Sequence, residues 1–292
     1  MKAILLGTAA GGGFPQWNCA CPMCTAGLPP RTQDCLAISA DGSSWYLINA
    51  SPDIRAQILA TKQLAPGPGP RETPLRGVLL TDAELDHTLG LTMLRETPVM
   101  SVWAPPAVLT ALHTDFPLAP ILSRYGTWTW HPITAPLTLD RLHITPIPIS
   151  TKHPKYTTSS TDTPWVVAYR IHDPTTGGTL IYAPCLSTWP EGFTELAAGA
   201  TCIILDGTFY SADEMSTATH TGVPTPTQRA MGHLPITGPT GTLPRIAAHP
   251  TKRWLYTHLN NTNPLLNPTS PEHAAVLNGG AEIPMDGTEL NL

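Results

Sequence analysis

The chain has 292 residues, a formal net charge of -5 and a hydrophobic fraction of 41%. It is long for one domain, but a sandwich of two sheets reaches this length without dividing, so we expect a single domain over residues 1–292. The scattered basic residues form no stripe that would bind a nucleic acid, and no run of roughly twenty apolar residues could span a membrane. Residues 1–13 indicate a first strand and a turn instead of a signal peptide, so we expect a soluble, cytoplasmic protein.

Short segments rich in β-branched or aromatic residues and bounded by Gly, Pro, Asn or Asp are predicted to be strands. They are residues 2–8, 45–50, 77–81, 99–104, 142–149, 166–171, 179–184, 202–207 and 253–259. Helices are predicted at residues 51–60, after His87, at 105–116 and around 194–198. Clustered strands with a few helices between them predict an α/β fold with two β-sheets face to face and helices outside.

Loops are predicted where the 33 prolines and the small polar residues gather. Proline interrupts helices and central strands, so residues 64–74 and 222–239 are expected to be loops. The polar segment 159–163 is expected to be a loop near the functional site.

Three of the six cysteines lie within six positions, as Cys19-x-Cys21-x-x-Cys24. Disulfides are disfavoured in a reducing cytosol and soft thiolates favour zinc, so the cluster predicts a zinc-binding turn. Because no acid or base stands beside it, we assign the zinc a structural role. The fourth ligand is left open among His258, Asn261, an Asp or water, and three cysteines without a metal are the alternative.

The other cysteines carry less information. Cys35 and Cys202 are predicted to be buried thiols, and Cys185 a small buried residue.

A group of acidic residues and a histidine follows the predicted strand 77–81 directly. It comprises Asp82, Glu84, Asp86 and His87. Oxygen and imidazole donors so close together favour iron or zinc. An acidic helix N-terminus would explain Asp82 and Glu84, but it does not explain His87.

The same segment resembles the H-x-H-x-D-H motif of metallo-β-lactamase-fold hydrolases, with both leading histidines replaced by Asp82 and Glu84. The resemblance implies that the first metal position of a two-zinc hydrolase is lost, whereas Asp86 and His87 remain for the second. The related phosphodiesterases of the carbon-phosphorus pathway have a similar N-terminal region but keep the histidine-rich motif.

Six segments in the same order resemble the PqqB family of pyrroloquinoline quinone biosynthesis. They are GTAAGGGFPQWNCACPMC, INASPDIRAQI, LLTDAELDHTLGLTMLRE, DGTFY, MGHLPITGP and THLNNTNPLL. The resemblance spans nearly the whole chain and implies a metallo-β-lactamase-type αβ/βα sandwich of two mixed β-sheets flanked by helices.

The resemblance also implies roles for individual residues. His258 is expected to join Asp86 and His87 as a metal ligand, and two histidines with one carboxylate suit a non-haem Fe²⁺ centre. Asp206 is expected to bind the metal or to orient a ligand histidine, and His233 to act as a general base or to bind substrate, so both are catalytic candidates.

Further residues are expected to support the site or to stand outside it. Three residues are candidates for orienting the metal ligands by hydrogen bonds on the side away from the metal: Asp82, Glu84 and Asn261. Two positions depart from what the resemblance leads us to expect: Cys185 stands where a glycine is expected, and His153 is treated as a loop histidine.

Three activities are left open by the sequence. The resemblance implies an iron-dependent oxygenase that hydroxylates the tyrosine ring of a cross-linked Glu-Tyr precursor, with this peptide-derived molecule and other proteins of the pathway as partners. The broken motif fits equally a carrier that moves the quinone or its precursor toward the periplasm. A mononuclear zinc hydrolase is the third reading.

Overall fold

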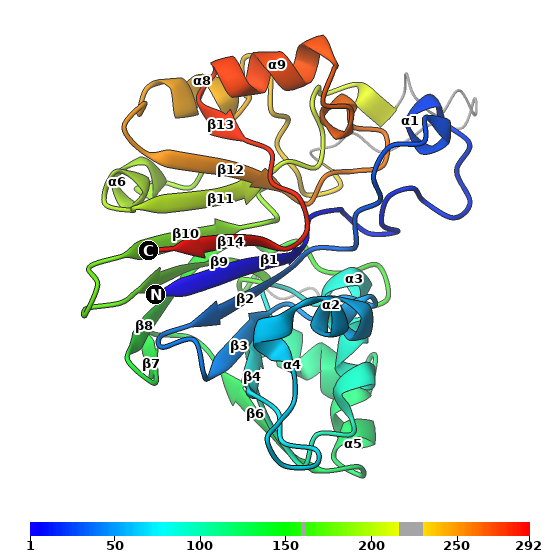
Figure 1. Ribbon diagram of the computed structural model, residues 1–292, viewed down its shortest axis with the longest axis vertical. Coiled ribbons are helices and arrows are strands. Elements are labelled where there is room, and N and C mark those ends of the chain that lie inside the picture. Colours follow the sequence, from blue (N-terminus) through cyan, green and yellow to red (C-terminus); the bar gives the residue numbers. More distant parts are fainter. Residues whose placement is uncertain (159–161, 216–229) are drawn as a thin grey trace.

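Two seven-stranded sheets lie face to face in the computed structural model, which describes residues 1–158, 162–215 and 230–292 (Figure 1). The first sheet consists, in spatial order, of β14 (Thr288–Asn291), β1 (Lys2–Gly7), β2 (Cys35–Ser39), β3 (Trp45–Ile48), β4 (Leu75–Leu79), β5 (Val99–Ala104) and β6 (Thr127–Pro132). The second consists of β13 (Ala281–Glu282), β12 (Arg253–Thr257), β11 (Cys202–Asp206), β10 (Thr179–Ala183), β9 (Val166–His172), β8 (Leu142–Ser150) and β7 (Leu137–Leu139).

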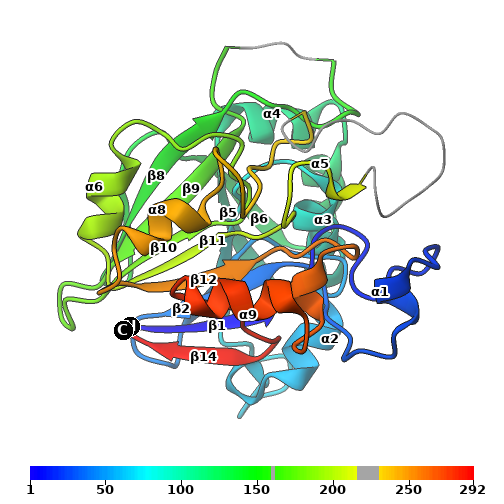
Figure 2. The same ribbon diagram turned by 90° about the horizontal axis from the view of Figure 1, so that it is seen from above.

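Helices cover the outer faces of the sheets, and Figure 1 shows two groups of them on opposite sides. Beside the first sheet lie α2 (Ile54–Ala60), α3 (Leu85–Thr88), α4 (Pro106–His113) and α5 (Leu118–Leu122), and beside the second lie α6 (Phe193–Ala198), α8 (Leu243–Ala247) and α9 (Pro271–Asn278). Short 3-10 helices lie next to three of these α-helices: η1 (Lys62–Leu64) follows α2, η2 (Leu89–Leu94) follows α3, and η3 (Pro264–Leu266) precedes α9. The small helix α1 (Pro22–Thr25) is set off at one edge of the molecule (Figure 2).

Alternating side chains of the strands build two layers of core. Leu5 and Ile38 of the first sheet share one buried cluster with Tyr169 and Ile204 of the second, and this cluster contains no helix residue. The other faces of the strands pack in a second cluster with helix residues such as Val108. Because successive side chains of a strand point to opposite faces, strands buried on both faces read as almost continuous apolar runs.

Each sheet contains an antiparallel half and a parallel half. Strands β3 to β6 pair in parallel in the first sheet, and β10 to β13 do so in the second. Chain segments that follow the carboxyl ends of β4, β10, β11 and β12 therefore collect at one edge, where open α/β sheets bind their ligands. Every candidate site residue outside the cysteine cluster except His233 ends one of these strands or lies in the segment that follows it, where Asp86 and His87 belong to α3.

The predicted architecture of two mixed sheets flanked by helices is confirmed. All nine predicted strands are present, but the prediction omitted β2, β6, β7, β13 and β14, and likewise α1, α5, α8 and α9. The helix expected at 51–60 begins only at Ile54, because Pro52 and Asp53 form a turn. Residues 64–74 form the expected loop after the last residue of η1, whereas 159–161 and 222–229 lie outside the described residues.

Within the described ranges, no helix combines the length and the apolar character that a membrane crossing requires.

A buried carboxylate, Asp34, connects the two sheets. It lies just before β2 and accepts hydrogen bonds from the hydroxyls of Tyr182 in β10 and Thr257 in β12. Burial raises the pKa of Asp34, although the nearby His258 and His87 oppose this effect. The two hydroxyls therefore replace the water that the carboxylate loses on folding.

Removing one of these hydroxyls should destabilise the fold. We expect Tyr182→Phe to lower the free energy of unfolding by about 1–3 kcal/mol, because Asp34 would lose a buried donor. Denaturant unfolding measures the change. Tyr125→Phe, at an exposed tyrosine, is the control and should stay within about 0.5 kcal/mol of the unchanged protein; equal stability of both variants would contradict the role of Asp34.

Candidate metal centre

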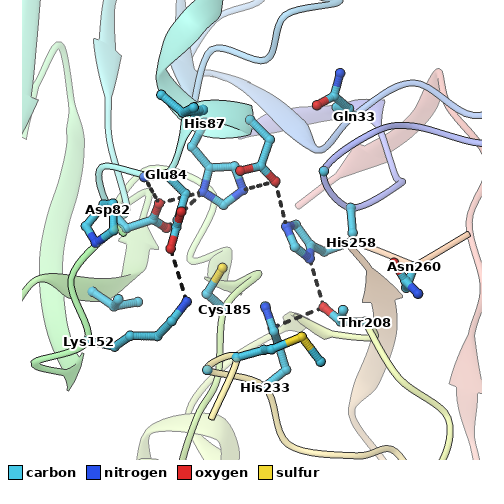
Figure 3. Close-up of a pocket in the computed structure, with 18 of the residues that line it drawn as sticks. Gln33, Asp82, Glu84, His87, Lys152, Cys185, Thr208, His233, His258 and Asn260 are labelled. Atoms are coloured by element: carbon cyan, nitrogen blue, oxygen red, sulfur yellow. Dashed lines mark hydrogen bonds and ion pairs between the residues drawn. The ribbon is translucent and has the colours of Figure 1, made fainter. Parts of the chain in front are cut away.

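Three histidines from different parts of the chain meet at the edge where the parallel strands end. The ring centroids of His87 and His258 lie 5.2 Å apart, and those of His258 and His233 lie 5.3 Å apart. His87 and His258 are buried, and the His233 side chain is 12% exposed. Figure 3 shows the three rings around one space, with Cys185 and Lys152 at its other side.

His87 is oriented by the carboxylate of Asp82. Its Nδ1 lies 2.9 and 2.8 Å from the two carboxylate oxygens. An ionised carboxylate only accepts hydrogen bonds, so Nδ1 carries the proton. Nε2 then has a free lone pair that can bind a metal.

His233 and His258 are oriented in the same way by Asp206 and Thr208. Asp206 Oδ2 accepts from His233 Nδ1 at 2.7 Å, and Asp206 Oδ1 accepts from the Thr208 hydroxyl at 2.6 Å. The Thr208 oxygen in turn lies 2.8 Å from His258 Nδ1, whose proton it accepts. All three histidines thus carry the proton on Nδ1, which leaves each Nε2 able to bind a metal.

Asp86 approaches the free nitrogens of two of these rings. Its Oδ2 lies 3.3 Å from His258 Nε2 and 3.9 Å from His87 Nε2. Neither nitrogen makes a hydrogen bond among the described residues, although both atoms are buried. Two buried nitrogens that face a carboxylate without forming a hydrogen bond are the arrangement that a bound cation would satisfy.

The charges of the site favour a cation as well. Burial would raise the pKa of Asp82 and Asp206, but the nearby histidines outweigh it and lower both values. Burial would lower the pKa of His87, but Asp82 and Asp86 outweigh it and raise the value to about 10. A region with several buried carboxylates therefore holds positive charge, which protons or a metal ion can supply.

The backbone at His258 is constrained. His258 follows β12 with a φ of 58°, in the left-handed region that few residues other than glycine adopt. Such strained positions are maintained where the surrounding structure fixes them, often at functional sites.

A cavity of about 620 Å³ opens onto the histidines and is also lined by Glu84, Lys152, Lys155, Tyr156 and Cys185. Lys152 Nζ lies 3.0 Å from Glu84 Oε1, and the Tyr156 hydroxyl donates to the Ala83 carbonyl at 2.6 Å. The cavity is large enough for a small organic molecule.

The structure brings most of the sequence-predicted residues together. Asp86, His87 and His258 converge, and Asp82 stands behind His87 as expected. Asp206 accepts four hydrogen bonds, from the Leu186 and Thr208 amides, the Thr208 hydroxyl and His233, so it orients His233 and has no oxygen left for a metal.

Three other predicted positions lie apart from the metal-facing nitrogens. The Glu84 side chain pairs with Lys152, although the Glu84 carbonyl accepts from the His87 amide at 3.0 Å. Asn261 lies against the cysteine cluster instead. His153 belongs to a loop, with its Nδ1 2.9 Å from the Thr157 hydroxyl.

Two residues of the site were missed by the sequence reading. Thr208 orients two histidines, but a threonine after a strand carries no signature of its own. Cys185 was expected to be a small buried residue; it is half-buried, and its sulfur lies within 4.8 Å of one ligand nitrogen each of His87 and His258. Burial raises the pKa of this thiol, and the carboxylates of Asp82 and Asp206 raise it further.

The cysteine cluster forms a second, separate group. The sulfurs of Cys19, Cys21 and Cys24 lie within 4.8 Å of one another. The Asn261 side-chain nitrogen lies 3.2, 3.8 and 3.4 Å from them, and the Gln16 amide donates to Cys24 Sγ. The arrangement fits one zinc ion held by three thiolates.

The structure removes one of the candidates for the fourth zinc ligand of the cysteine cluster. His258 faces Asp86 at the other site and is not available. Asn261 is the polar side chain at the cluster, and turning its amide by half a turn would present an oxygen to the ion. An Asp or a water remains the alternative.

Two mixed sheets with a group of histidines at the edge where the parallel strands end define a protein of the metallo-β-lactamase class. The sequence-family model of the beta-lactamase superfamily domain matches residues 44–259. Coenzyme PQQ synthesis protein B of Pseudomonas entomophila is 40% identical, with both chains covered completely. The crystal structure of Zn²⁺-bound PqqB from Methylobacterium extorquens has a TM-score of 0.89 and 34% identity, again with full coverage of both chains. The chain therefore belongs to the PqqB family.

A more distant likeness agrees with the fold. A diphosphatase from the PhnP family has a TM-score of 0.71 at 19% identity, covering 100% of this chain and 97% of that one.

The hydroxyl of Thr208 should matter for metal binding. We expect Thr208→Val, which keeps the shape of the side chain, to weaken binding at the histidines by about 10- to 100-fold, because His258 loses its orienting partner. Calorimetric titration with zinc or Fe²⁺ measures this. Thr127→Val, at an exposed position of β6, should bind as the unchanged protein does, and equal affinity in both variants would contradict the role of Thr208.

Zinc content should report the cysteine cluster. We expect Cys21→Ser to lose about one equivalent of zinc per chain, because a serine hydroxyl does not replace a thiolate ligand. Metal analysis after dialysis measures the loss. Cys202→Ser, at a buried thiol of β11, should keep that zinc; undiminished zinc in Cys21→Ser would argue against a metal at the cluster.

Proposed function

We propose that this chain is an iron-dependent oxygenase of pyrroloquinoline quinone biosynthesis that hydroxylates the tyrosine ring of a cross-linked Glu-Tyr precursor. The convergence of Asp86, His87 and His258 carries the proposal, because two histidines and one carboxylate are the ligand set of non-haem Fe²⁺ oxygenases. Membership of the PqqB family gives the pathway.

The metal site would be mononuclear. In the H-x-H positions of the dinuclear hydrolases this chain has Asp82, which holds His87 from behind, and Glu84, which pairs with Lys152. Neither side chain is free to bind a first metal ion. This favours chemistry at one ion over two-metal hydrolysis.

When bound by Asp86, His87 and His258, Fe²⁺ would supply the binding and activation of dioxygen. The protein residues then have to bind the substrate and move a proton. Lys155 lines the cavity and would hold a carboxylate of a precursor derived from glutamate and tyrosine, whereas the neighbouring Lys152 is paired with Glu84.

His233 is placed to handle the proton of the substrate phenol. Its Nδ1 is held by Asp206, so Nε2 is the atom that would accept the proton. Asp206 would stabilise the ring after it gains this charge and would keep its orientation.

Two alternative functions predict different experimental results, and either result would contradict the proposal. Tight binding of the quinone without turnover in any metal would point to a carrier. Zinc-dependent hydrolysis without oxygen would point to a mononuclear hydrolase.

Turnover should depend on both iron and oxygen. We expect the protein reconstituted anaerobically with Fe²⁺ to hydroxylate the precursor once oxygen and an external reductant such as ascorbate are admitted, because one oxygen atom enters the ring and the other needs two electrons and two protons to leave as water. His87→Ala and His258→Ala should reduce the rate by more than about a hundredfold, because each removes a metal ligand. Mass spectrometry of the product measures the reaction. His143→Ala, at an exposed histidine of β8, is the matched control and should keep the full rate.

A further inference from the structure

Cys185 stands beside the proposed metal ligands, and no role was expected for it. It follows Pro184 directly after β10, and its sulfur and one ligand nitrogen each of His87 and His258 lie within 4.8 Å of one another. Figure 3 shows the sulfur pointing toward the His87 ring, on the cavity side. We propose that the Cys185 thiolate is a further ligand of the metal held by Asp86, His87 and His258.

This inference rests on the proposed metal centre and goes beyond its ligand set. Zinc bonds to sulfur and to imidazole nitrogen are about 2.3 and 2.0–2.1 Å long, so two such donors on one tetrahedral ion lie roughly 3.5 Å apart. The three donor atoms lie within 4.8 Å of one another, so each pair has to approach by at most roughly 1.3 Å to share one ion.

An independent observation points to a ligand at the same place. His87 Nε2 and His258 Nε2 are buried polar atoms that make no hydrogen bond among the described residues. The two histidines belong to the same group of candidate ligands as Cys185. A cation bound between them would satisfy both nitrogens and would come within reach of the thiol.

Two hydrogen bonds hold the backbone directly after Cys185. The next residue, Leu186, donates its amide to Asp206 Oδ2 at 2.7 Å and accepts from the Leu234 amide at 2.7 Å. Asp206 is the carboxylate that also orients His233. One buried group therefore sets the positions of the thiol and of a neighbouring histidine together, as a preorganised ligand set requires.

A cation also explains how a thiolate could exist in this position. Burial and the carboxylates of Asp82, Asp206 and Asp86 oppose a negative charge on the sulfur and outweigh the ammonium of Lys152, which favours it. A divalent cation reverses the sign of the local field and ionises a coordinating thiol.

A thiolate ligand would also affect the choice of metal. Sulfur is a softer donor than a carboxylate oxygen, so Cys185 would strengthen binding of zinc and cadmium more than that of magnesium or manganese.

Cadmium NMR distinguishes the two metal sites, because the cadmium resonance moves downfield as thiolates replace oxygen and nitrogen ligands. We expect the full-length protein loaded with cadmium to give two resonances, one from the three-thiolate cluster and one at a position that indicates a single sulfur. In Cys185→Ala and Cys185→Ser the second resonance should move upfield, and cadmium affinity at this site should fall by about tenfold or more.

The first resonance is an internal control for folding, because it comes from Cys19, Cys21 and Cys24 and should not move. Cys202→Ala removes a buried thiol outside both groups and should leave both resonances in place. Cys185→Asp supplies an oxygen ligand, so it should keep the second ion while its resonance still moves upfield.

The possible failures are distinguishable. If two resonances appear and the second is unchanged in the Cys185 variants, Cys185 is not a ligand and the metal centre stands without it. If the unchanged protein gives the cluster resonance alone, the proposed metal centre itself fails, and the inference fails with it.

Discussion

The hydrogen bonds to the Nδ1 atoms of three histidines are the interactions on which the site depends. Asp82 binds His87, Asp206 binds His233, and Thr208 links Asp206 to His258. Each bond fixes a tautomer and a ring orientation, so the three Nε2 atoms face the same space. The two-sheet fold makes this possible because strands of both sheets end at one edge.

The altered motif has a structural meaning beyond the loss of two histidines. In this chain the carboxylate of Asp82 sits behind a metal-facing ring, and Glu84 neutralises Lys152 at the cavity. The positions that would hold a first metal ion in a dinuclear hydrolase thus have other partners. The chain keeps the superfamily fold, and the changed motif is the basis for proposing a site with a single metal ion.

Much of the fold could be predicted from the sequence, because central strands buried on both faces are continuous apolar runs such as residues 202–205. The edge strands β13 and β14 escaped prediction since they are short and partly exposed. Asp86, His87 and His258 could be found from motif resemblance, whereas Thr208 and Cys185 could not. Their importance comes from which strand ends lie side by side in space, and a single sequence does not give that arrangement.

The contact between Asn261 and the cysteine cluster ties two distant parts of the chain together. Asn261 lies three residues beyond His258 and contacts the cysteine cluster. The cluster follows Gly11 and Gly12 in the sequence by a few residues, and these two glycines line the cavity. Whatever occupies the thiols therefore braces the loop that leaves His258. Zinc binding at the cysteine cluster and metal binding at the histidines would then be thermodynamically linked. A chelator that removed the zinc would therefore also lower the metal affinity of the histidine site.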